Sequence, residues 1–232
     1  MAIVDPTSLA LTVDALNEAF FSGRPLSKAE REQAAGWLAG RQGLPGSYAG
    51  MFAPTEQDRR EGFRLFTGEP VTTRAGTAHV LGEEASRALI LLDVKRASIR
   101  DALARATEGM LERLRDAERR ERNMGRTWLG QYCCGKCTAA LWRHLAAGGL
   151  EHAERHLGAG MRALKIHRDG AGKWRRYPFW YTVLTLSELD PPLAAEELRH
   201  AAPAIERSLR RAGGDRFAQR RRALAERVLA RR

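Results

Sequence analysis

Cysteine and histidine residues with the spacing of metal ligands are concentrated in one segment, from Tyr132 to His156. This segment contains all three cysteines and three of the six histidines of the 232-residue chain. Cys134 and Cys137 form a Cys-x-x-Cys pair, and a His-x3-His pair that begins at His152 follows after fourteen residues. Because thiolates and imidazoles at such spacings are typical zinc ligands, the segment formally fits a zinc site.

The apolar spacing of the same segment predicts helices instead. We expect a helix over 138–147, a turn at Gly148 and Gly149, and a second helix that runs back along the first. At about 1.5 Å of rise per residue, this arrangement holds the histidines on the order of 10 Å or more from the cysteines. We therefore favour no cofactor, and keep zinc only for a segment that is not helical, with Cys134, Cys137, His152 and His156 as ligands.

The three thiols allow a second kind of chemistry that needs no metal. Cys133, Cys134 and Cys137 lie at the N-terminus of the expected helix, beside Lys136. The helix dipole and the ammonium group both favour a thiolate, so a reactive thiol or a redox pair is one interpretation. The alternative, which the sequence favours, is burial as small apolar side chains among neighbouring aromatic residues.

Few other polar residues have a spacing that suggests a reaction. His79 and Glu83 are four residues apart on an expected helix, so they share a face and could act as an acid/base pair or as two metal ligands. A surface hydrogen bond is the commoner outcome for such a pair. Phosphate-binding P-loops, dinucleotide fingerprints, HExxH helices and GxSxG elbows are absent. No catalytic residue is identified, and the candidates are Cys134, Cys137, His79 and Glu83.

The chain is strongly basic, and its charge is unevenly distributed. The net charge is +11 and the isoelectric point is near 10.4, which favours a polyanionic partner. Nearly all the cations are arginines, a pattern that a GC-rich coding bias also produces. The arginines crowd the C-terminal helices expected from about residue 204, where few acids separate them. This arginine-rich end predicts a basic surface.

A short segment upstream, 174–181, mixes arginine with aromatic residues. Such a mixture suits stacking on nucleic-acid bases together with phosphate neutralisation, and equally suits a helix start with buried aromatics and solvated arginines. The expected nucleic-acid contacts are Arg175, Arg176, Trp174, Arg210, Arg211, Arg220, Arg221 and Arg222.

Helical periodicity runs through almost the whole chain, and no long alternating pattern predicts a strand. We expect an all-α fold in one domain over 1–232, an array of helical hairpins with about nine or ten helices. One helix should begin near Leu9 and end near Gly23, and capping patterns mark further starts. These patterns are Ser27 with Glu30, Ser98 with Asp101, Thr55 and Thr73. No apolar run reaches the roughly 18 residues of a membrane span, and no signal peptide is recognised, so we expect a cytoplasmic protein.

Two loops share one pattern, in which a helix end and a basic residue lead through a glycine-rich turn to an aromatic residue. They lie at 37–48 and 163–174. This pattern resembles the repeat of α/α-toroid proteins, the superfamily of terpenoid cyclases and protein prenyltransferases. The resemblance implies a partial α/α toroid, or a related HEAT-like solenoid, with an aromatic cavity for a small apolar, isoprenoid-like ligand. The catalytic motifs of that superfamily have no counterpart here, and the expected cavity residues are Trp37, Tyr48, Trp128, Tyr132, Trp174 and Tyr181.

Three functions therefore remain open from the sequence. The first, which the charge distribution favours, is nucleic-acid binding through the arginine-rich C-terminal helices, non-specifically or by shape. The second is binding or conversion of a small apolar ligand in a toroid-like cavity. The third is a scaffold that binds another protein.

Overall fold

A computed structural model describes residues 2–125, 131–148, 150–210 and 213–231 of the chain. The described residues form ten helices and one two-stranded sheet. The elements are α1 (Leu9–Ser22), α2 (Lys28–Ala39), α3 (Glu56–Glu61), β1 (Phe63–Arg64), β2 (Pro70–Val71), α4 (Arg74–Leu92), α5 (Ala97–Asn123), α6 (Gly135–Ala146), α7 (Ala153–Ile166), α8 (Phe179–Glu188), α9 (Pro191–Leu209) and α10 (Arg216–Leu229). The predicted all-α class and number of helices are thus confirmed.

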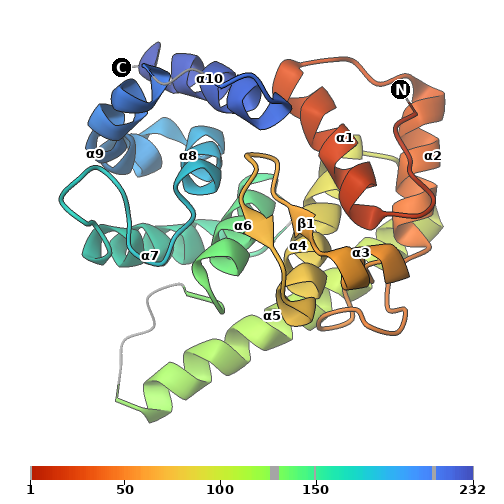
Figure 1. Cartoon of the computed structure of the whole chain (residues 1–232). Coiled ribbons are helices and arrows are strands. Elements are labelled where there is room, and N and C mark those ends of the chain that lie inside the picture. The colour runs from red at the N-terminus through yellow and green to blue at the C-terminus, as the bar shows by residue number, and fades with distance from the viewer. Residues whose placement is uncertain (1, 126–130, 149, 211–212, 232) are drawn as a thin grey trace.

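Two central helices, α4 and α6, pack against each other along most of their length and carry the core. Figure 1 shows α1 and α2 on one side of this pair, α7 to α9 on the other, and α10 across the top. Helix α4 is buried almost all round, including its polar residues, as expected for a helix enclosed by neighbours. The arrangement is an open array of helices without a closed barrel. In the described part, no helix is long and apolar enough to cross a bilayer.

The helix boundaries follow local capping chemistry. Helix α1 ends at Gly23, whose φ of 70° is the left-handed conformation that glycine adopts most readily. Ser27 and Glu30 form the predicted capping box, and Thr55 and Thr73 cap α3 and α4. The predicted box at Ser98 is wrong, because α5 already begins at Ala97.

The sheet is a small feature that the periodicity does not predict. Phe63 pairs with Val71 and Arg64 with Pro70 in antiparallel register. The two loops that share a sequence pattern also share a backbone feature, since a residue of each takes part in one isolated antiparallel bridge. These bridges join Gln42 to Phe52 and Arg168 to Trp174.

A buried network of charged side chains joins the central helices. Arg143 of α6 contacts Glu84 of α4 at 2.5 Å and Glu188 of α8 at 2.9 Å. Arg87 of α4 also binds Glu188, at 2.9 Å, and Asn17 of α1 at 2.8 Å. Four helices therefore meet in one set of ion pairs and hydrogen bonds, with Arg143 only 2 % exposed.

Replacing Arg143 by alanine leaves the buried carboxylate of Glu84 without its closest cation. We expect Arg143→Ala to lower the free energy of unfolding by about 3–5 kcal/mol, the usual cost of removing one partner of a buried ion pair. The exposed pair of Arg24 and Glu30 offers a control, and Arg24→Ala should cost at most about 1 kcal/mol. Urea unfolding of both variants measures the difference, and equal losses would show that the network adds no particular stability.

Candidate thiol and histidine site

The three cysteines lie at the start of α6. Cys134 is the N-cap residue of the helix and Cys137 lies in its first turn, so both sulfurs are at the same helix end. Their Sγ atoms are 3.4 Å apart. Cys133 and Cys134 are exposed, whereas Cys137 is buried. The expectation that burial dominates therefore holds for Cys137 alone, and the pair has one accessible and one enclosed thiol.

Close backbone contacts fix this helix start. A Cβ atom added at Gly135 would lie 2.0 Å from the carbonyl oxygen of Arg176, so only glycine allows this approach. On the other side, the backbone N–H of Tyr132 donates to the hydroxyl of Thr138 at 3.3 Å. These contacts determine where both thiols of the Cys-x-x-Cys pair point.

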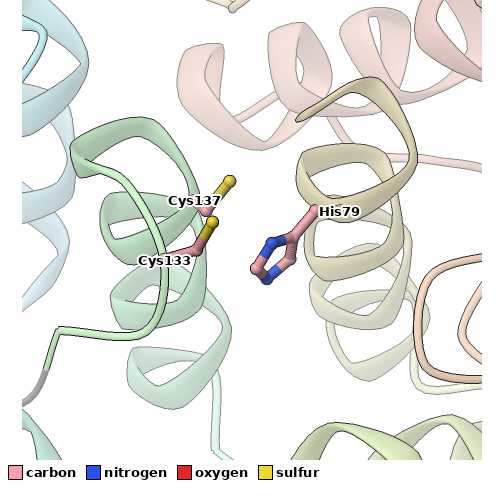
Figure 2. Close-up of side chains that lie close together, drawn as sticks. All are labelled: His79, Cys133 and Cys137. Atoms are coloured by element: carbon pink, nitrogen blue, oxygen red, sulfur yellow. The ribbon is translucent and has the colours of Figure 1, made fainter. Parts of the chain in front are cut away.

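His79 of α4 faces two of the three thiols. Figure 2 shows its ring edge turned toward Cys133 and Cys137, which come from the neighbouring helix and the segment before it. One nitrogen of His79 and the two sulfurs lie within 4.8 Å of one another. The ring is stacked on Tyr48 at 3.9 Å and meets the edge of Tyr132 at 4.4 Å between centroids. The imidazole is therefore held by a stacked ring on one face and by a second ring in an edge contact.

A buried carboxylate lies behind the imidazole. Oε1 of Glu83 is 3.7 Å from Nε2 of His79, and Oε2 of Glu83 is 2.8 Å from Nδ1 of His144. All three side chains are buried. The expected surface hydrogen bond between His79 and Glu83 is thus wrong, because both residues lie in the interface between α4 and α6. Glu83, His79 and the thiol of Cys137 therefore lie next to one another inside the protein.

Hydrogen bonding and burial shift the pKa values of the thiols in different directions. Hydrogen bonding from Cys137 and from backbone N–H groups lowers the pKa of Cys134 to about 5, against the effect of burial. The partnership with Cys134 and burial raise the pKa of Cys137. His79 lowers the pKa of Cys133. Burial opposes the charged form of His79, yet Cys133 and Glu83 outweigh it and raise the pKa of the imidazole.

The Cys-x-x-Cys pair opens into a cleft of about 550 Å³. Cys134, Gly135, Lys136 and Cys137 form one wall, from the first turn of α6. The opposite walls come from β2 and the segment after it, the first turns of α4 and the loop before α8, and they include Val71, Val80, Arg176 and Tyr177. A ligand in this cleft would meet Cys134 directly, with apolar and cationic groups around it.

The zinc ligands considered from the sequence do not converge. Cys134 precedes α6 and His152 precedes α7, so the full length of α6 separates them along the chain, roughly 18 Å for twelve helical residues at about 1.5 Å each. The convergent donors in the described ranges are instead His79, Cys133 and Cys137. Sequence reasoning missed this set because His79 lies more than fifty positions before the cysteines. No local spacing signals such a long-range contact.

The expected nucleic-acid residues are only partly available on the surface. Trp174 is buried and donates to Glu197 at 2.7 Å, and Arg220 is buried against Asp14 and Glu18 of α1. Arg221 donates to the carbonyl of Thr67 at 2.6 Å. Arg211 lies outside the described residues. The exposed members of the set are Arg175, Arg176, Arg210 and Arg222.

The aromatic residues expected to line a cavity are dispersed over the fold. Tyr48 and Tyr132 surround His79, whereas the hydroxyl of Tyr181 binds Glu84 within the buried charge network. Trp37 lies under Arg41, with 5.5 Å between the guanidinium carbon and the ring. Trp128 lies outside the described residues. Among the described members of the set, Tyr48 and Tyr132 share a site, beside His79.

Comparison with protein-family models, with curated proteins and with solved structures finds no match for this chain.

Enlarging Gly135 should displace the start of α6 and with it both thiols. We expect Gly135→Ala to lower the free energy of unfolding by about 1–3 kcal/mol, because the added methyl group meets a backbone atom that cannot move aside easily. Gly36→Ala is the matched control within a helix, since its methyl group would meet only Arg96, at 4.0 Å. Thermal unfolding and the rate of alkylation at Cys134 report the two effects. Unchanged values for Gly135→Ala would show that the contact with Arg176 does not position the site.

Proposed function

We propose that the protein is a thiol–disulfide redox protein whose reacting pair is Cys134 and Cys137. The observation that carries this proposal is the 3.4 Å separation of their Sγ atoms at a helix N-terminus, with one thiol open to a cleft and the other enclosed. A disulfide bond needs about 2.05 Å, so the sulfurs must approach by only about 1.3 Å. Helix N-termini stabilise thiolates, which are the reactive form of cysteine.

The accessible position of Cys134 makes it the attacking sulfur. Its thiolate attacks one sulfur of a substrate disulfide, the substrate S–S bond breaks, and one substrate thiolate leaves. The enclosed thiol of Cys137 gives its proton to that leaving thiolate. The Cys137 sulfur then attacks the sulfur of Cys134 and releases the second substrate thiolate. The substrate disulfide gains two electrons, and the protein ends with a Cys134–Cys137 disulfide.

The surroundings of the pair support a disulfide substrate in the cleft. Lys136 and Arg176 place positive charge beside Cys134, and this charge stabilises both the attacking and the leaving thiolate. Val71, Val80 and Tyr177 give the floor of the cleft an apolar lining, although each is largely buried. The separation of roles between an exposed and a buried thiol prevents the enclosed sulfur from reacting first.

The test is oxidation of the reduced protein by oxidised glutathione, followed by intact mass and peptide mapping. We expect the wild type to lose two hydrogen atoms and to contain a Cys134–Cys137 disulfide. Cys134→Ser should block the reaction, whereas Cys137→Ser should stop at a mixed disulfide between Cys134 and glutathione. Cys133→Ser is the matched control, because Cys133 is outside the pair, and it should still form the disulfide. A disulfide that forms in Cys134→Ser as in the wild type would contradict the proposal.

Nucleic-acid binding through the basic surface stays a prediction, with fewer exposed arginines than the sequence suggests. Its exposed members Arg175 and Arg176 lie in the loop before α8, where Arg176 also lines the cleft. Arg210 and Arg222 lie toward the C-terminal end. The guanidinium groups that dock α10 onto α1 are already paired with acids. The observations therefore favour the thiol pair over the arginines as the functional centre.

A further inference from the structure

We propose that His79, Cys133 and Cys137 bind one Zn²⁺ ion when the thiols are reduced, and that the Cys134–Cys137 disulfide prevents this binding. The first half of the proposal stands on the geometry alone, and the second half rests on the proposed redox function. The metal site and the redox pair have only Cys137 in common, so variants of the other residues can test them separately.

The three donor atoms already converge from α4, α6 and the segment just before α6. In tetrahedral zinc sites, with bonds of about 2.3 Å to sulfur and about 2.0 Å to nitrogen, ligand atoms lie roughly 3.4–3.8 Å apart. The nitrogen of His79 and the sulfurs of Cys133 and Cys137 lie within 4.8 Å of one another. A contraction of about 1 Å therefore reaches the metal-bound geometry, and rotation of the exposed Cys133 side chain can supply most of it. Figure 2 shows both sulfurs on the same side of the ring edge.

A second observation concerns the contact between His79 and Glu83. Nε2 of His79 and Oε1 of Glu83 are buried, and neither has a hydrogen-bond partner within the described part of the chain. Their separation of 3.7 Å is too long for a hydrogen bond. Imidazoles that bind zinc through one ring nitrogen usually donate the other N–H to a carboxylate, and Glu83 lies where such a carboxylate belongs. A metal ion would fix the tautomer of His79 and complete this hydrogen bond.

The charges also suit a divalent ion. Two thiolates, one neutral imidazole and Zn²⁺ sum to zero, so binding would avoid leaving a net charge in a largely enclosed position. Thiolate and imidazole donors favour zinc over the hard cations Mg²⁺ and Ca²⁺. Three protein ligands leave the fourth tetrahedral position for a water molecule, which the exposure of Cys133 allows.

Oxidation and metal binding compete for one sulfur. When Cys137 forms a disulfide with Cys134, its sulfur no longer carries the negative charge that binds zinc. His79 and Cys133 alone are too few ligands for a stable site. The presence of zinc should in turn slow formation of the disulfide, because the bound sulfur is a weaker nucleophile.

Titration of the reduced protein with Co²⁺ and Zn²⁺ tests the metal site. Co²⁺ bound to thiolates gives a sulfur-to-metal absorption band. Zn²⁺ should displace the bound Co²⁺ and abolish this band, at one Zn²⁺ per chain. We expect Cys133→Ser and His79→Ala to weaken binding at least a hundredfold, and Glu83→Gln to weaken it about 10–100-fold through the orientation of His79. Circular dichroism confirms that each variant is folded, and the exposed Cys133 makes Cys133→Ser the variant least able to disturb the core.

Two matched controls come from the ligands considered from the sequence. Cys134→Ser and His152→Ala should retain the absorption band and the affinity, because neither residue belongs to the convergent set. A loss of binding in either control, equal affinity in Cys133→Ser and wild type, or no binding at all would overturn the metal site. None of these results alters the test of the redox pair, since Cys133→Ser should still form the disulfide and Cys134→Ser should not.

A last measurement joins the two halves. Wild-type protein carrying the Cys134–Cys137 disulfide should show at least a hundredfold weaker Co²⁺ binding, restored by dithiothreitol. Undiminished binding by the oxidised protein would overturn the link between oxidation and metal release, while leaving the reduced metal site intact.

Discussion

The structure depends on the way in which α4 and α6 are joined by buried charges. Two consecutive residues on each helix form the connection: Glu83 and Glu84 on α4 face His144 and Arg143 on α6. Burying charged groups is costly, and such pairs often add less stability than apolar side chains of the same volume would. Their effect here is to specify position, because an axial shift of either helix would separate both pairs at once and leave charges unpaired in the core.

This constraint reaches the thiols through short paths. Glu83 is one turn from His79 along α4, and Arg143 and His144 follow Cys137 by less than two turns along α6. The pairing of α4 with α6 therefore also determines how far the imidazole lies from the sulfurs. Tyr48 and Tyr132 then fix the angle of the ring. The chemistry of the site is a consequence of the register between two helices, adjusted by aromatic packing.

The sequence predicts the parts of this fold that depend on neighbours along the chain. Gly23 ends its helix by a left-handed turn and Ser27 caps the next one, and both effects act within four residues. The helix after the cysteines was predictable for the same reason, and α6 lies between Cys134 and His152 along the chain. The assignment of Ser98 as a cap fails because Arg96 already supplies the last non-helical residue before α5.

The site itself is harder to predict because charge in the sequence does not distinguish a surface from a buried network. Glu83 and Arg143 look like residues of solvated helix faces, and only the packing of α4 on α6 shows that they are buried. The same ambiguity affects α10, where Arg220 pairs with Asp14 and Glu18 instead of facing solvent. A guanidinium group and a carboxylate can meet across any distance in sequence, so composition overstates the free positive charge. In a chain whose basic residues are nearly all arginine, acids on neighbouring helices decide which cations are left for a partner.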